Sequence, residues 1–240
     1  MIDIPLILIT ALCPVALLLW YIYKSDPIKE PKEQLAKAFL YGVLIVPPVV
    51  IVELLLQYIL FRGNESQPTL LTTFSDAFLV AALTEEAFKL LALWFLLKKN
   101  PYFDEHIDGI VYAVFISLGF AALENVTYLF SNYEMWITVG ITRALLAVPG
   151  HYAFGILMGF FYSLYYFGKR SARNKRLIFL APFLAHGLYD LFAMSSVLSP
   201  MMAIVCFICL IGFCIWMHRF CRKRISSHLH RDRKVFGNQA

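Results

Sequence analysis

The sequence predicts an all-α, polytopic transmembrane helix bundle. Of its 240 residues, 60% are hydrophobic and only 15% are charged, whereas an average soluble domain carries about 25% charged residues. The mean hydropathy is +0.68. Long uncharged runs alternate with short clusters of Lys and Arg, which is the pattern expected when about 20 apolar residues must cross roughly 30 Å of hydrocarbon. These observations exclude a soluble globular domain.

Seven apolar runs have about the length that a bilayer requires. They are residues 4–23, 38–61, 74–97, 110–130, 149–167, 177–198 and 201–217. No Lys or Arg precedes the first run to form the basic region of a cleavable signal peptide, so we expect a retained span. In the second run, Pro47 and Pro48 predict a bend. In the fifth, Gly155 and Gly159 form a small-xxx-small pair that lets a neighbouring helix approach.

The stretch 135–148, which contains Arg143, decides the predicted topology. Cytoplasmic flanks of membrane proteins collect Lys and Arg. With seven spans, the N-terminus outside and the C-terminus in the cytoplasm, 18 of the 21 basic residues fall on the cytoplasmic side. If residues 135–148 formed a further full crossing, the basic residues would no longer fall on one side of the membrane. We therefore expect residues 135–148 to form a re-entrant or interfacial helix on the outer face, ending at a kink at Pro149 and Gly150.

The chain is predicted to form one integral membrane domain, residues 1–240, located in the cell membrane. It has no internal repeat, and its basic cytoplasmic tail, residues 218–240, is the only candidate for disorder. The net charge of +5 is explained by flanks that face anionic lipid, so the bilayer is an expected partner and nucleic acid is not. The five cysteines lie in or beside apolar runs, which predicts neither a disulfide framework nor redox chemistry.

Ionisable residues interrupt the third, fourth, fifth and sixth apolar runs, in addition to Glu53 in the second. An ionisable side chain at the bilayer centre costs roughly 2.5 to 3.5 kcal/mol, and such residues usually face the bundle interior and serve function. They are Glu85, Glu86 and Lys89 in the third run, Glu124 in the fourth, His151 in the fifth, and His186 and Asp190 in the sixth. Spacings of three or four residues place each set on one helix face.

These residue types suit hydrolysis. A carboxylate in a partly dry pocket is a good general base for water. Two His and one Glu from separate helices are also the ligand types of a catalytic zinc site, for which Glu124, His151 and His186 are the candidates. Asp190, one turn after His186, is spaced to orient that imidazole. Both Zn²⁺-dependent and metal-free chemistry remain open at this point.

The order of these motifs resembles the PrsW family of intramembrane proteases. The motifs are EExxK (Glu85, Glu86, Lys89), FxxxE (Phe120, Glu124), a later span opened by His151, and HxxxD (His186, Asp190). The segment FDEHIDGIVYAVFISLGFAALEN is similar to the family's FxDGIxYG and GFAxxEN stretch, and the likeness covers roughly residues 76–192. The related CAAX prenyl endopeptidases typically show EExxxR, FxxxH and HxxxN, from which this chain departs at Lys89, Glu124 and Asp190.

The resemblance implies an intramembrane endopeptidase that cuts a single-span membrane protein near the outer membrane surface, typically the first cut of an anti-sigma factor. It implies Glu85, Glu86, His186 and Asp190 as catalytic residues. It leaves the metal open, because the family is classed with metalloproteases while the related CAAX enzymes look metal-free. No other cofactor is expected.

Other interpretations stay beside this one. The chain could be a CAAX-type or bacteriocin-related membrane protease with another substrate. It could also be a proton-coupled transporter, because Glu, His and Asp inside a bundle form proton relays, although it has no inverted repeat. Structurally, the two glutamates of the third run could pair with Lys89 or Arg143, and Glu124 with Arg143. Glu53, in the second run, is predicted to be a structural partner of Arg143 or an interface residue.

Overall fold

The computed structural model describes residues 4–61 and 68–236, which contain helices and no β-strand. The α-helices are α1 (Ile4–Ser25), α2 (Lys32–Leu44), α3 (Val46–Phe61), α4 (Leu70–Ser75), α5 (Leu83–Leu97), α6 (His106–Ser131), α7 (Trp136–Thr142), α8 (Val148–Tyr166), α9 (Ala172–Ser195) and α10 (Pro200–Phe236). Two π-helical segments, η1 (Asp76–Ala82) and η3 (Arg143–Ala147), and a 3₁₀ turn, η2 (Tyr133–Met135), join some of them. The predicted all-α membrane bundle is confirmed.

Six helical stretches of the described chain are long and apolar enough to cross a membrane. They are Ile4–Ser25, Lys32–Phe61, His106–Ser131, Tyr133–Tyr166, Ala172–Ser195 and Pro200–Lys234. The remaining predicted run, residues 74–97, is also helical, as the end of α4 followed by η1 and α5, but its charged residues keep it outside this apolar set. The second stretch breaks at Ile45, between α2 and α3, so the bend predicted from Pro47 and Pro48 is present. Both prolines lie in the first turn of α3, where a missing backbone N–H costs little.

The expected separate helix before Pro149 is not found. Residues Tyr133–Tyr166 instead form one helical stretch, in which η2, α7, η3 and α8 follow one another. Pro149 lies at the start of α8, directly after the π-helical segment. A π-helical turn relaxes the regular hydrogen-bond ladder, so the proline ring fits without ending the helix.

The expected tail is also different, because α10 continues as a helix to Phe236. A buried stripe at helical spacing, from Met217 through Cys221 and Ile225 to His228, continues the apolar face beyond the hydrophobic run. The Nε2 atom of His228 lies 3.1 Å from the carbonyl oxygen of Phe160 on α8. The basic residues of this segment therefore extend from a docked helix.

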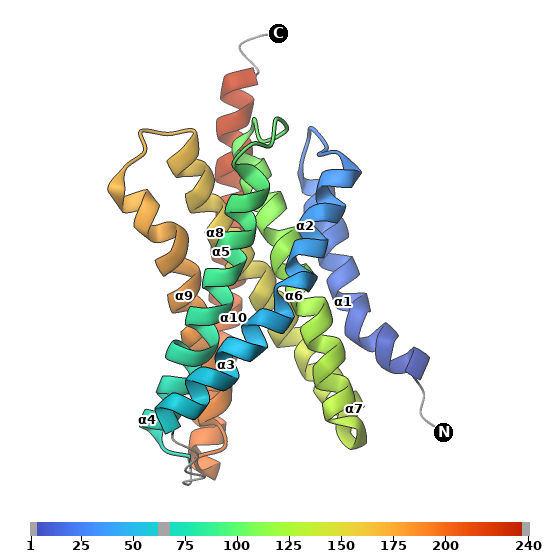
Figure 1. The fold of residues 1–240 in the computed structure, drawn as a ribbon, viewed down its shortest axis with the longest axis vertical. Coiled ribbons are helices and arrows are strands. Elements are labelled where there is room, and N and C mark those ends of the chain that lie inside the picture. Colours follow the sequence, from blue (N-terminus) through green and yellow to red (C-terminus); the bar gives the residue numbers. More distant parts are fainter. Residues whose placement is uncertain (1–3, 62–67, 237–240) are drawn as a thin grey trace.

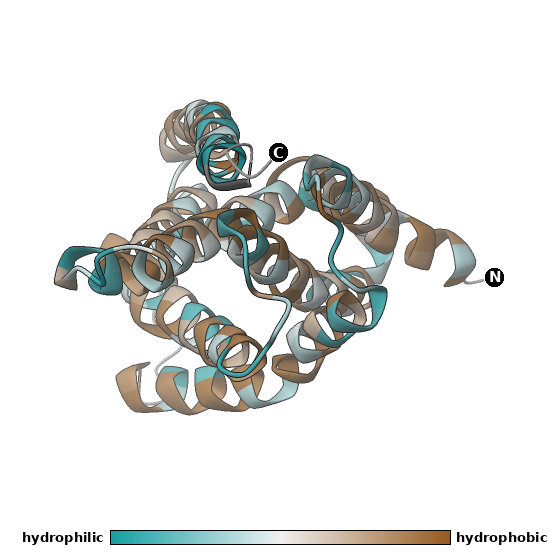
Figure 2. Ribbon diagram, turned by 90° about the horizontal axis from the view of Figure 1, so that it is seen from above, coloured by the Kyte–Doolittle hydropathy of each residue, from teal (hydrophilic) through white to brown (hydrophobic). Residues whose placement is uncertain are grey.

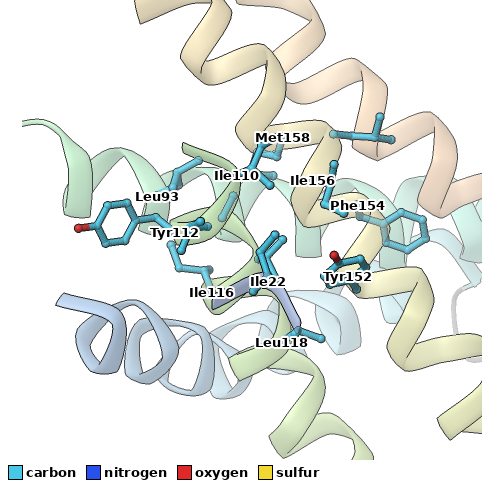
Figure 3. Packing of buried hydrophobic residues seen from close by; sticks show 14 of the residues in the cluster. Ile22, Leu93, Ile110, Tyr112, Ile116, Leu118, Tyr152, Phe154, Ile156 and Met158 are labelled. Carbon is cyan, nitrogen blue, oxygen red and sulfur yellow. The ribbon is translucent and has the colours of Figure 1, made fainter. Parts of the chain in front are cut away.

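Helices α6 and α8 form the centre of the bundle. Both are buried along most of their length, and their side chains fill the core (Figure 3). Gly159 of α8 lies so close to Gly109 of α6 that a Cβ there would overlap the carbonyl oxygen of Gly109. The close approach predicted from Gly155 and Gly159 is confirmed, and it fixes α6 against α8.

The connections of the bundle separate into two ends (Figure 1). The α1–α2, α5–α6 and α8–α9 connections and the end of α10 lie at one end, and the start of α1, the α6–η2 turn and the α9–α10 turn lie at the other. Seen from above, hydrophilic residues gather in the connections and helix ends, while the outer helices are largely hydrophobic (Figure 2). The predicted basic flanks thus share one end, which we call the basic end. Its cytoplasmic orientation stays a prediction.

Candidate active site

The third predicted run places two carboxylates around one ammonium group. The Nζ atom of Lys89 lies 2.9 Å from Oε2 of Glu85 and 2.9 Å from Oε1 of Glu86. These three residues are buried, Glu86 completely. Because one turn of α5 separates the acids from the lysine, the helix itself sets this geometry. The structural ion pair considered from the sequence therefore exists, and it is part of a larger cluster.

His186 joins α9 to this cluster. Its Nδ1 atom lies 2.9 Å from Oε1 of Glu86, and its Nε2 atom lies 3.1 Å from Oδ2 of Asp190 one turn along α9. The ring also stacks on Phe154 of α8, with the ring centroids 4.7 Å apart. With both nitrogens facing carboxylate oxygens, each can donate a hydrogen bond only when the ring carries two protons. The imidazole is thus held on three sides.

A second group surrounds Glu124 of α6. Its Oε2 atom accepts hydrogen bonds from Nη2 of Arg143 at 2.7 Å and from Nε2 of His151 at 2.8 Å. Arg143 also donates from Nε to Oδ1 of Asn125 at 2.5 Å. The Nδ1 atom of His151 lies 3.3 Å from Nζ of Lys89, so Lys89 and His151 connect the two groups. The pairing of Glu124 with Arg143 considered from the sequence is present, and His151 shares it.

The two groups border one cavity of about 250 Å³ between α3, η1, α5, α6, α8 and α9. The acidic, basic and histidine residues that line it are Glu53, Asp76, Glu85, Glu124, Arg143, His151, His186 and Asp190. Glu86 and Lys89 stand behind this surface. Phe120, Phe154 and Tyr189 supply apolar walls. The arrangement can hold a peptide bond and a water beside several groups able to move protons.

Glu53 is the residue that the sequence reasoning misplaced. It was expected to pair with Arg143 or to lie at an interface, but within the described residues it makes no ion pair with Arg143 and faces the cavity instead. The sequence signal was available, because an acid within an apolar run is a functional candidate by default. Gln57, one turn further along α3, lines the same cavity, so the spacing of Glu53 and Gln57 marks a polar face of this helix.

The structure groups the metal-type donors differently from the predicted set. Glu85, Glu86 and His186 each offer one donor atom, and these atoms lie within 4.8 Å of one another. Glu124 bonds to His151, while His186 bonds to Glu86, so Glu124, His151 and His186 do not converge in this way. The Oε2 atom of Glu86 is buried without a hydrogen-bond partner. Carboxylate and imidazole donors with a free buried oxygen fit a divalent ion.

Two π-helical segments precede the helices that carry site residues. Segment η1 leads into α5 and its two glutamates, and η3 leads into α8 and His151. Such segments are rare and often occur at functional sites. Composition does not reveal these segments, because they have the local composition of an α-helix.

Comparisons with known proteins show the family of the chain. Residues 30–217 match the model of the PrsW family intramembrane metalloproteases. A protein named Protease PrsW from Oceanobacillus iheyensis is 36% identical over 215 residues, which covers 85% of this chain and 93% of that protein. Proteins of the same name from Clostridioides difficile and Geobacillus kaustophilus are 32% and 40% identical and cover 94% and 73% of this chain, and 92% and 74% of their own lengths. No solved structure matches significantly.

Proposed function

Because the chain belongs to the PrsW family of intramembrane metalloproteases, and is therefore a multi-pass peptidase of the bacterial cell membrane, we propose a substrate and a division of labour within the cavity. The substrate is a single-span membrane protein, and an anti-sigma factor is the typical case. The cut falls near the extracytoplasmic surface. One observation carries this placement, namely where the cavity lies along the bundle.

The cavity lies away from the basic end. Its wall includes Gln57, Tyr128 and Met194, which stand near the C-terminal ends of α3, α6 and α9. These helix ends point away from the basic end (Figure 1). If the basic end faces the cytoplasm, as the distribution of Lys and Arg predicts, a substrate reaches the cavity from the extracytoplasmic half of the bilayer.

We assign the water-activating role to Glu85. Its carboxylate lines the cavity, whereas that of Glu86 is buried behind it. Glu85 accepts a proton from a water whose oxygen attacks the scissile carbonyl carbon, and then returns that proton to the departing amine. His186 lines the same cavity, and its Nε2–H is shared between Asp190 and the oxyanion that forms.

Glu86, Lys89 and Asp190 act by positioning. Glu86 and Asp190 hold the two nitrogens of His186, as expected for partners that fix ring orientation. Lys89 balances the two adjacent glutamates at 2.9 Å each. A buried carboxylate is costly without a partner, so this ammonium keeps both acids in place.

A divalent ion, with Zn²⁺ the proposed one, would be held by Glu85, Glu86 and His186. When bound, it supplies a Lewis acid that polarises the carbonyl and generates a nucleophilic water at neutral pH. In that case Glu85 is a ligand, and Glu53, which lines the cavity and forms no ion pair among the described residues, takes the proton. Glu53→Gln therefore distinguishes the two forms, because it removes activity only where Glu85 is occupied as a ligand.

The test uses the full chain in detergent with a fluorescent single-span substrate. Wild type is expected to cleave, and Glu85→Gln is expected to be inactive. The control Glu134→Gln, an exposed acid, is expected to retain full activity. Mass spectrometry of the products locates the new terminus. Cleavage on the cytoplasmic side of the substrate span, or activity in Glu85→Gln, would overturn the proposal, and elemental analysis beside Glu53→Gln decides the metal.

A further inference from the structure

A second acidic cluster lies at the basic end, far from the cavity. It comprises Asp26 in the α1–α2 connection, Glu105 just before α6, and Asp108 in the first turn of α6. One carboxylate oxygen from each lies within 4.8 Å of the other two. Segments about 80 residues apart in sequence thus bring three acids to one point, and this convergence is independent of the proposed proteolysis.

All three acids are buried, and each has an oxygen with no partner. Asp26 is 1% exposed, Glu105 is 4% exposed and Asp108 is 0% exposed. Asp26 uses Oδ1 to accept the N–H of Ile28 at 3.1 Å, and Asp108 uses Oδ2 to accept the N–H of Glu105 at 2.6 Å. The other oxygens, Oδ2 of Asp26, Oε2 of Glu105 and Oδ1 of Asp108, are buried without a hydrogen bond. Such orphaned oxygens are costly unless a ligand satisfies them.

The negative charge is not balanced by the protein around it. A fourth acid, Glu30, is also buried and accepts a hydrogen bond from the hydroxyl of Tyr112. Within the described residues, no Lys or Arg forms an ion pair with any of the four acids. Lys29 is the nearby ammonium, and its Nζ atom donates to backbone carbonyls such as that of Tyr23 at 2.8 Å. Buried charges are normally paired or bound to metals.

We propose that Asp26, Glu105 and Asp108 bind a hard divalent cation, Mg²⁺ or Ca²⁺, with Glu30 at the edge of the site. The described donors are all oxygens, which favours these ions over zinc or copper, since those ions take nitrogen and sulfur ligands readily. A doubly charged ion would both coordinate the oxygens that lack a hydrogen bond and offset the negative charge of the carboxylates. This site differs from the catalytic cluster, where His186 contributes nitrogen.

The position of the site gives the ion a structural role. It ties the α1–α2 connection to the first turn of α6, and α6 carries Glu124 at its other end. The same turn is bound from a third direction, because Asp232 of α10 accepts the backbone N–H groups of His106 and Ile107 at 2.9 and 3.0 Å. An ion therefore braces the central helix from the end opposite the active-site cavity.

Terbium luminescence tests the site in the purified full chain. After treatment with a chelator, Tb³⁺ is titrated and excited through tyrosine, with Tyr112 as the sensitiser because its hydroxyl contacts Glu30. We expect saturable emission that Mg²⁺ or Ca²⁺ displaces, and the ion that competes at the lower concentration is the one the site prefers. Asp26→Asn and Asp108→Asn should each weaken Tb³⁺ binding by at least about tenfold, in line with the effect of altering metal-ligand shells.

Matched variants make the result specific. Glu33→Gln removes an exposed acid of α2 and should leave the titration unchanged. Tyr112→Phe keeps every carboxylate, so it should reduce emission excited through tyrosine while directly excited emission persists, which also covers the case of an Asn variant that folds poorly. Unchanged binding in both Asn variants, no competition by Mg²⁺ or Ca²⁺, or undiminished tyrosine-excited emission in Tyr112→Phe would each overturn the proposal.

Discussion

Glu86 on α5 holds His186 on α9, with Oε1 of the carboxylate 2.9 Å from Nδ1 of the imidazole. Glu86 is fully buried, so this contact belongs to the interior of the protein and not to the cavity surface. Glu85, its neighbour in sequence, lines the cavity. Adjacent residues on a helix point about 100° apart, which explains how one helix turn supplies both a group for the water and a support for the imidazole.

Gln substitutions at the two glutamates are therefore expected to differ in size. Glu85→Gln removes the proposed base, and kcat should fall by about 10⁴-fold, which leaves no detectable cleavage. Glu86→Gln leaves the base but weakens the support of His186, and kcat should fall by about 10- to 100-fold with little change in KM. Steady-state cleavage of a labelled substrate measures both. Equal losses, or a loss confined to KM, would contradict this division of roles.

Removing the buried ammonium is expected to destabilise the fold. Lys89→Met keeps much of the side-chain volume but leaves Glu85 and Glu86 without their partner, which typically costs about 3 to 5 kcal/mol. Lys37→Met removes an exposed lysine of α2 and serves as the control, with an expected change within about 0.5 kcal/mol. Thermal or denaturant unfolding in detergent compares the two. A Lys89→Met protein as stable as the control would show that the acids do not need this cation.

Two glycines offer a matched test of packing at the centre of the bundle. At Gly159 a Cβ would overlap the backbone of Gly109, whereas at Gly212 on α10 a Cβ would meet nothing within 4 Å. Gly159→Ala should force α6 and α8 apart and cost at least about 1 to 3 kcal/mol. Gly212→Ala should be neutral, or stabilising by about 0.5 to 1 kcal/mol because alanine favours the helix. The same unfolding assay applies, and the reverse order would contradict the described helix contact.

In chelator, stability is expected to rise as the pH falls. Burial raises the pKa of Asp26 to about 6 and the pKa values of Glu30 and Glu105 to about 7. These carboxyls bind a proton more tightly when folded than when unfolded, so folding becomes less favourable as the pH rises from the unfolded pKa, about 4, through the folded pKa. Other charged or titratable groups facing them are Lys29, Asp104, His106, Asp108, Tyr112 and Asp232.

The measurement is the unfolding midpoint between about pH 8 and pH 5.5, and the double variant Asp26→Asn, Glu30→Gln is the comparison. The slope should be smaller in the double variant because fewer protons are taken up on folding. A midpoint that falls on acidification in wild type, or an unchanged slope in the double variant, would contradict the raised pKa values.

Contacts within one helix were predictable from the sequence, and contacts between helices were not. The spacing of three or four residues correctly placed Lys89 beside its two acids and Asp190 beside His186. The partner of each histidine on another helix depends on how the helices rotate and approach, which apolar runs do not encode residue by residue. This is why Glu124, His151 and His186 were grouped as ligands, while the folded chain brings His186 to Glu86 instead.

The lengths of the apolar runs predict that a span exists more reliably than they predict where its helix ends. The run at residues 201–217 stops at the last apolar residue, yet α10 continues to Phe236 because one face stays buried after the other becomes basic. Average hydropathy combines both faces and loses this distinction. The direction of Glu53 is indicated by Gln57, one turn later on the same face of α3, and both line the cavity.

The two π-helical segments, η1 and η3, determine in which direction around the helix axis the following site residues point. Asp76 at the start of η1 and Glu85 in the following helix both reach the cavity wall, although the segment between them is wound more widely than an α-helix. Deleting one residue there would shorten the chain axially by only about 1.5 Å, but it would turn everything beyond it by roughly 100°. The span would still cross the bilayer while its two glutamates faced elsewhere. Hence the number of residues in η1 and η3 is under constraint in addition to side chains such as that of Arg143, and insertion or deletion scanning tests the number directly.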